Sequence, residues 1–76
     1  MIATYESLTP EQTKLVRRAE WGLEIMNPRD PGHRLDAVTS IEHLVAISLS
    51  NNINAGDKEK LAKLRISLKQ RVALLS

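Results

Sequence analysis

The fold is decided by residues 9 to 32, TPEQTKLVRRAEWGLEIMNPRDPG. Thr9 is a favourable N-cap, Pro10 suits the first position of a helix, and Gln12 follows at the spacing of a capping box. A capping box satisfies backbone N–H groups that have no partner inside the helix. A helix is therefore expected to begin at residue 10.

This first helix should end just before the next proline. Its apolar residues share one face at the 3.6-residue period; they are Leu15, Ala19, Gly22, Leu23 and Met26. Pro28 disfavours α geometry in the residue before it, so the helix is predicted over residues 10 to 26. Residues 27 to 32 form a short link rich in turn formers, as antiparallel neighbouring helices require. A helical hairpin is therefore expected.

The second helix is predicted from about Pro31 to Asn51, with Asp30 as its N-cap. Its buried face is expected to pack on the first helix, with Ala37 and Leu44 at the edges of that face. The residues assigned to this face are Val38, Ile41, Val45, Ser48 and Leu49.

A third helix is predicted from about Asp57 to Leu74, after the pattern breaks at residues 51 to 56. Its apolar residues have near-heptad spacing; they are Leu61, Leu64, Leu68, Val72 and Leu75. Basic residues surround this narrow seam: Lys58, Lys60, Lys63, Arg65, Lys69 and Arg71. Such a seam suits either docking on the hairpin or pairing with a second subunit, and the sequence leaves both open.

The predicted fold class is all-α, with one helical domain over 1–76. It comprises an N-terminal segment (1–9), a helical hairpin (10–53) and a basic C-terminal helix (54–76). A chain of this size buries only about 60% of its unfolded surface. We therefore predict a homo-oligomer, a dimer or a larger assembly up to a hexamer.

Charge is distributed unevenly along the chain. Residues 1–53 hold five Lys/Arg against seven Asp/Glu, giving −2, whereas residues 54–76 hold six against two, giving +4. Cysteine is absent, which fits a reducing compartment. The N-terminus lacks the features of a secretion signal and no apolar run reaches about 20 residues. A cytoplasmic location, without membrane association, is expected.

Two aromatic residues occur in the whole sequence, Tyr5 and Trp21. Trp21 and Ile25 lie four residues apart and form a second apolar patch, beside the main face of the first helix. Burial of this patch against the third helix or another subunit is the ordinary expectation for large apolar side chains. Tyr5 precedes the capping box, where it either packs at the edge of the core or stacks on a ligand.

Several polar residues are candidates for binding an anion. Lys14, Arg17 and Arg18 lie within two turns of one another on the first helix, where they either contact phosphate or form a solvated face. Arg34 and Thr39 lie near the start of the second helix, whose backbone N–H groups favour negative charge. Ordinary surface roles are equally open to both.

The sequence shows no machinery for catalysis. His33 and His43 are ten residues apart, which is not a ligand spacing on adjacent turns, so no metal site is expected. Nothing supplies a nucleophile, an oxyanion hole or a glycine-rich phosphate loop. We therefore predict a binding protein that is not an enzyme and needs no cofactor.

A series of short motifs occurs in a suggestive order: Tyr5, Thr9-Pro10-Glu11-Gln12, Pro31 to Arg34, Ala37, Thr39-Ser40-Ile41-Glu42 and Asn52-Ile53-Asn54. Over about two-thirds of the chain, they resemble the helical-hairpin domain of phage anti-CBASS and Thoeris anti-defence proteins. Those proteins act as sponges for cyclic nucleotide signals. The resemblance implies a phage protein in the bacterial host cytosol that sequesters cyclic di- or trinucleotides, or cyclic ADP-ribose isomers, without cleaving them.

The resemblance also implies roles for individual residues. Tyr5 would stack on a base, and Arg17 or Arg18 would contact a phosphate. Arg34 and Thr39 would line a separate site for larger cyclic oligonucleotides. The sequence departs from the family around Leu35-Asp36. It also has Ala46-Ile47-Ser48 in the middle of the second helix, where an aromatic residue is usual.

Two other functions remain open from the sequence. The basic helix over residues 57 to 71 suits a small regulator that binds nucleic acid. However, the overall charge is small and no helix-turn-helix spacing is evident, so nucleic acid is not the expected partner. Alternatively, the Trp21–Ile25 patch suits a protein-protein inhibitor.

Overall fold

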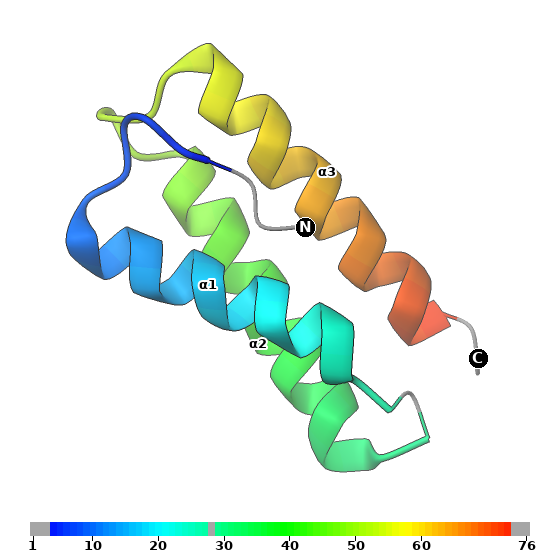
Figure 1. Cartoon of the computed structure of the whole chain (residues 1–76). Coiled ribbons are helices and arrows are strands. Elements are labelled where there is room, and N and C mark those ends of the chain that lie inside the picture. Colours follow the sequence, from blue (N-terminus) through cyan, green and yellow to red (C-terminus); the bar gives the residue numbers. More distant parts are fainter. Residues whose placement is uncertain (1–3, 28, 74–76) are drawn as a thin grey trace.

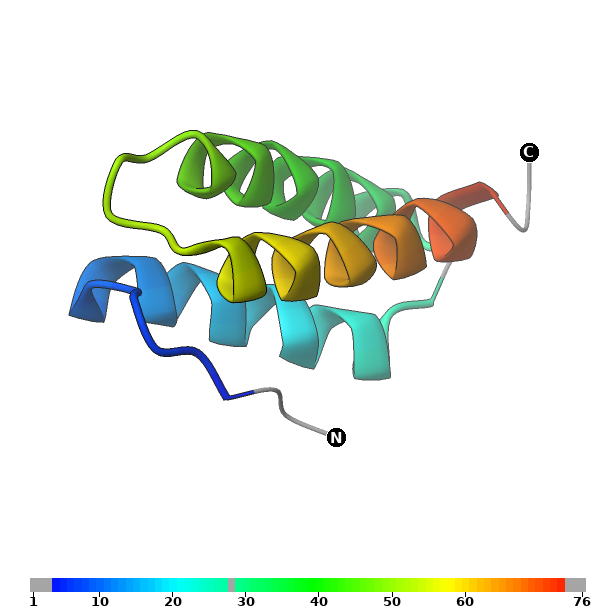
Figure 2. The same ribbon diagram turned by 90° about the horizontal axis from the view of Figure 1, so that it is seen from above.

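The computed structural model describes residues 4–27 and 29–73, and over these residues it contains three α-helices and no strand. The helices are α1 (Pro10–Ile25), α2 (Pro31–Ser48) and α3 (Ala55–Ala73). Consecutive helices run in opposite directions, and α3 lies beside both members of the hairpin (Figures 1 and 2). The all-α class and the predicted hairpin are confirmed.

The start of α1 is stabilised by the predicted capping box. The Gln12 N–H donates to Thr9 Oγ1 at 3.2 Å, and the Thr9 N–H donates to Gln12 Oε1 at 2.9 Å. At the other end, the Met26 N–H donates to the Gly22 carbonyl at 2.8 Å before the chain turns away. Both boundaries of the first helix are therefore confirmed to within one residue.

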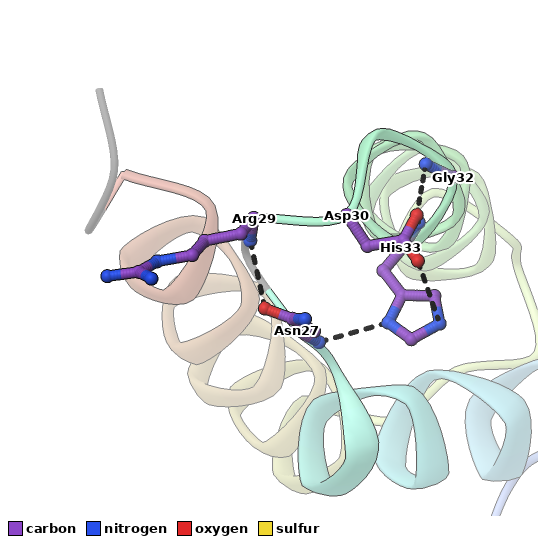
Figure 3. A network of polar contacts seen from close by, with 5 residues as sticks. All are labelled: Asn27, Arg29, Asp30, Gly32 and His33. Atoms are coloured by element: carbon purple, nitrogen blue, oxygen red, sulfur yellow. Dashed lines mark hydrogen bonds and ion pairs between the residues drawn. The ribbon is translucent and has the colours of Figure 1, made fainter.

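A small polar network closes the link between α1 and α2 (Figure 3). Asp30 is the N-cap of α2, as predicted, and its Oδ1 accepts from the N–H groups of Gly32 at 2.8 Å and His33 at 3.4 Å. The Asn27 N–H donates to His33 Nδ1 at 3.0 Å, and the Arg29 N–H donates to Asn27 Oδ1 at 3.1 Å. His33 therefore connects the end of α1 to the first turn of α2.

The core lies where the three helices meet. It contains Val16, Ala19, Met26, Ala37, Leu44, Ile47, Ile53, Leu61 and Leu68. Leu61 and Leu68 come from the predicted seam of the third helix and are almost completely buried. Within the described residues, this seam therefore docks on the hairpin. Of the two roles that the sequence left open for it, docking on the hairpin is confirmed. Leu74 and Leu75 lie outside the described residues.

The predicted buried face of the second helix is wrong. The buried residues of α2 are Ala37, Ser40, Leu44 and Ile47. Val38 is 42% exposed, Val45 is 38% exposed and Leu49 is 79% exposed. Of the five predicted residues, Ile41 is the one that packs against the core cluster. Apolar residues lie on several sides of this helix, so its periodicity does not identify the inner face.

The turn between α2 and α3 also differs from the prediction. α2 ends at Ser48 instead of Asn51, because the chain enters a turn at residues 49 to 52. α3 begins at Ala55, two residues earlier than predicted, and the Asp57 N–H donates to Asn54 Oδ1 at 2.7 Å. A short polar side chain just before a helix accepts such bonds, so Asn54 caps α3.

Candidate functional site

A buried carboxylate ties the N-terminal segment to α3. Asp57 is 1% exposed and accepts hydrogen bonds from the Glu6 N–H at 3.1 Å and from the Ser7 N–H at 2.7 Å. The Ser7 hydroxyl also donates to Asp57 Oδ2. Asn52 Nδ2 donates to the Ser7 carbonyl at 2.8 Å, which attaches the same segment to the α2–α3 turn. The segment before α1 is therefore held in place by side chains about 50 residues away in sequence.

The hydrogen bonds keep Asp57 ionised despite its burial. Burial alone would raise the pKa of the carboxyl group, but the bonds from Ser7 and Glu6 and the charge of Lys60 outweigh it, and the pKa lies below its ordinary value. Asp57 also lies in the first turn of α3, where a negative charge is favoured by the helix dipole. We interpret Asp57 as a structural residue.

Tyr5 lies at the edge of the core, close to charged residues of both α1 and α3. Its half-buried side chain packs against the core cluster, and Lys60 Nζ lies 5.8 Å from the centre of the ring. The Lys60 ammonium group donates to the Thr4 carbonyl. Burial raises the pKa of the Tyr5 hydroxyl; Glu20 and Asp57 also raise it, while Arg17 lowers it. Of the two roles considered from the sequence, the geometry favours packing at the core edge.

A pocket of about 230 Å³ opens between α1 and α2. Its lining consists of Arg18, Trp21, Gly22, Ile25, Met26, His33, Asp36, Ala37, Ser40 and Leu68. Small residues on both helices, Gly22 on α1 and Ala37 on α2, leave the space that larger side chains would fill. We take this α1–α2 pocket as the candidate functional site.

The wall of the pocket on α1 carries an exposed aromatic ring next to a cation. Trp21 is 62% exposed and Ile25 is 47% exposed, so the expected burial of this patch against the third helix is wrong, while burial against another subunit stays a prediction. Arg18 lies one turn before Trp21, on the same side of the helix. An indole ring and a guanidinium group side by side can stack on a base and bind a phosphate.

The wall of the pocket on α2 is polar. His33, Asp36 and Ser40 line it, and Ser40 is 8% exposed. They offer hydrogen-bonding groups to a ligand whose face lies against Trp21. Asp36 and Ser40 were not predicted from the sequence as site residues, and His33 was considered only as a metal ligand. Their spacing of three and four residues around Ala37 was the available signal for a shared helix face.

The cations of α1 that the sequence singled out point in different directions. Arg17 Nη1 forms an ion pair with Glu20 Oε1 at 2.8 Å and lies on the side of Tyr5, whereas Arg18 lines the α1–α2 pocket. Successive residues on a helix are turned by about 100° from each other, which separates these two neighbours. Lys14 is exposed and does not line the pocket.

The two candidates on α2 also lie away from the pocket lining. Arg34 is half-buried, and Thr39 is exposed, with its hydroxyl donating to the Leu35 carbonyl at 3.1 Å. The structure therefore brings together Tyr5 with Arg17 on one side of α1, and Arg18 with Trp21 on the other. It does not unite all six predicted site residues in one place.

The basic residues of α3 are partly engaged within the chain. Lys60 contacts Thr4, Lys63 lies 3.5 Å from Glu59, and Arg71 Nη2 donates to the Leu23 carbonyl at 3.1 Å. Three of the six Lys and Arg residues of this helix therefore have partners within the chain. The helix therefore does not present one uninterrupted basic face.

Comparisons with family models, with curated proteins and with solved structures find no match to this chain. None of the helices within residues 4–27 and 29–73 is long and apolar enough to cross a membrane. In the same part of the chain, no group of three His, Asp or Glu side chains is arranged to hold a metal ion.

Proposed function

We propose that this protein binds a cyclic nucleotide signal and sequesters it without cleaving it, and that the α1–α2 pocket receives one base of the ligand. The observation that carries the proposal is the exposed Trp21 indole ring beside Arg18 at the mouth of the pocket. An indole ring that is 62% exposed contributes little to the packing of the chain, but it offers a stacking surface for a base.

The size of the pocket limits how the ligand sits. Pockets that enclose a whole drug-sized ligand measure about 300 to 1,000 Å³, and this one is smaller, at about 230 Å³. A base would therefore enter between the helices, within reach of the polar groups of His33, Asp36 and Ser40. The phosphates would stay outside near Arg18, where a charge-assisted hydrogen bond can form.

This placement revises the roles that the resemblance implies. Stacking moves from Tyr5, which packs at the edge of the core, to Trp21, and of the two arginines considered for the phosphate contact we assign it to Arg18. The ligand class itself rests on the resemblance of the sequence motifs.

The test is a fluorescence titration, because Trp21 is the sole tryptophan of the chain and reports directly on the pocket. Cyclic dinucleotides, cyclic trinucleotides and cyclic ADP-ribose isomers would be compared with a DNA duplex. Arg18→Ala should weaken binding about 10-fold to 150-fold, since hydrogen bonds to charged groups contribute about 1.5 to 3 kcal/mol. Arg17→Ala is the matched control and should change the affinity less than about twofold.

Each outcome has a distinct meaning. If Arg17→Ala weakens binding and Arg18→Ala does not, the site lies on the Tyr5 side of α1 and the pocket assignment is wrong. If the DNA duplex alone binds, the regulator hypothesis replaces the proposal. Chromatography of the ligand after incubation would detect any hydrolysed product, which would contradict binding without cleavage.

The exposure of Trp21 and Ile25 also favours a second function, inhibition of a protein through this apolar patch. Aromatic residues at exposed positions are common at the centre of protein interfaces. In that case none of the nucleotides would quench Trp21 fluorescence in the titration.

A further inference from the structure

The outward face of α2 carries a row of exposed side chains, four of them apolar and one acidic, which we call the outer seam: Leu35, Val38, Glu42, Val45 and Leu49. Leu35 is 68% exposed and Leu49 is 79% exposed, and the two valines between them are about 40% exposed. The spacing alternates between three and four residues, as in the contact seam of two helices packed side by side. At about 100° per residue, this row points away from the buried face of α2.

The composition of α2 indicates that its outer side is enclosed by another molecule. α2 has three charged residues among its 18, namely Arg34, Asp36 and Glu42, whereas α3 has eight among 19. A helix that is apolar on nearly all sides is normally buried on all sides. In Figure 2, α2 forms one edge of the bundle, with a side turned away from both other helices.

The order of residues in the outer seam favours a second copy of this chain as the partner. Read from either end, the seam gives leucine, valine, glutamate, valine and leucine, with Glu42 seven residues from each leucine. A two-fold axis near Glu42 therefore places Leu35 of one chain opposite Leu49 of the other when two α2 helices run in opposite directions. The valines lie one residue out of register in this arrangement, because Val38 is four residues from Glu42 and Val45 is three. Isologous dimers require such a self-complementary patch. We propose that a second copy of this chain covers the outer seam, with the two α2 helices antiparallel.

The available area suits such a dimer. A standard protein interface removes about 800 Å² from each partner, which is about one-sixth of the 5146 Å² that this chain exposes. In the proposed dimer, the outer seam and the exposed side chains beside it would supply this area. This surface differs from the one expected from the sequence, which was the Trp21–Ile25 patch and the seam of the third helix.

The experiment compares equal substitutions on the two exposed apolar surfaces by sedimentation equilibrium. The parent chain should form a species of twice its mass of 8.5 kDa. Leu49→Glu should raise the dissociation constant at least tenfold, because it places a charge in the seam. Ile25→Glu is the matched control at another exposed apolar position, and it should change the constant less than twofold.

A second pair of variants strengthens the dimer instead of breaking it. The proposed axis brings the two Glu42 carboxylates together, so Glu42→Gln should lower the dissociation constant severalfold by removing like-charge repulsion. Asp36→Asn removes the same charge on the pocket side of α2 and should have no effect.

A parent chain that stays at 8.5 kDa at every concentration would overturn the proposal. So would dissociation by Ile25→Glu with no effect of Leu49→Glu. Circular dichroism melts would show that each variant still folds, as expected for positions this exposed. Leu35→Glu, at the opposite end of the outer seam, repeats the test if Leu49→Glu does not fold.

Discussion

Replacing Asp57 by Asn should weaken the attachment of the N-terminal segment while preserving the shape of the side chain. The carboxylate accepts from two backbone N–H groups, those of Glu6 and Ser7, and from the Ser7 hydroxyl. An amide offers a single acceptor oxygen, and its NH₂ group would face donors where the second oxygen now lies. The side chain is 1% exposed, so water cannot easily replace the lost partner.

The size of the effect follows from these contacts. A hydrogen bond to a charged group contributes about 1.5 to 3 kcal/mol, and a carboxylate near a helix N-terminus adds about 0.3 to 1 kcal/mol. Loss of one such bond together with the dipole interaction gives about 2 to 4 kcal/mol. At about 4 to 8 °C per kcal/mol for a domain of this size, the melting temperature should fall by at least about 8 °C.

The control is Glu59→Gln, two residues along α3. Its side chain is 70% exposed and lies 3.5 Å from Lys63, an exposed pair whose loss should change stability by about 0.5 kcal/mol or less. Thermal melts followed by circular dichroism would measure both variants. Equal melting temperatures for Asp57→Asn and Glu59→Gln would refute the structural role assigned to Asp57.

Asp57 should also make the stability of the folded chain depend on pH. The pKa of Asp57 is lower in the folded chain than its ordinary value, so its stabilising effect is complete above about pH 4 and is lost as the pH falls through the folded pKa. The free energy of unfolding of the parent should therefore drop below about pH 4 more steeply than that of Asp57→Asn. Parallel curves in acid would show that another carboxylate is responsible.

Two further variants test how the helix ends are held together. Arg71→Met removes the hydrogen bond to the Leu23 carbonyl near the end of α1 but keeps an apolar side chain. Urea denaturation should show that the free energy of unfolding falls by about 1 to 2 kcal/mol, and an unchanged midpoint would contradict this role. Gln12→Ala removes the hydrogen bond from the Thr9 N–H, which is the second half of the capping box, and a 2.8 Å bond from Asn52. In the same assay the free energy of unfolding should fall by about 1 kcal/mol. A fall below about 0.3 kcal/mol would show that water replaces these bonds.

Features encoded by neighbouring residues were predictable from the sequence. The capping box at Thr9 and the N-cap at Asp30 depend on side chains within three residues of the backbone groups that they bind. The helix starts and the hairpin followed from them. The turn after α2 was less predictable, because Asn54 and Asp57 both suit the start of a helix and their roles depend on the surrounding contacts.

Features that depend on distant residues were not predictable. The bonds between Ser7 and Asp57 span 50 residues, and no local pattern indicates them. The inner face of α2 was misassigned because the strongly apolar valines lie in the outer seam, whereas the small residues Ala37 and Ser40 lie on the buried face. Small residues permit close approach of helices, but their burial is decided by which neighbours face them.

The residues on which the two proposals rest lie on different sides of α2. The residues that line the pocket and those of the outer seam are interleaved in sequence, as Leu35 and Asp36 illustrate, yet they point to different sides of the helix. A pocket formed within one chain implies one ligand per chain, whether or not two chains associate. A ligand enclosed between two subunits would instead give one ligand per interface. The stoichiometry of binding therefore distinguishes these two modes, because pairing through the outer seam leaves the mouth of each pocket open.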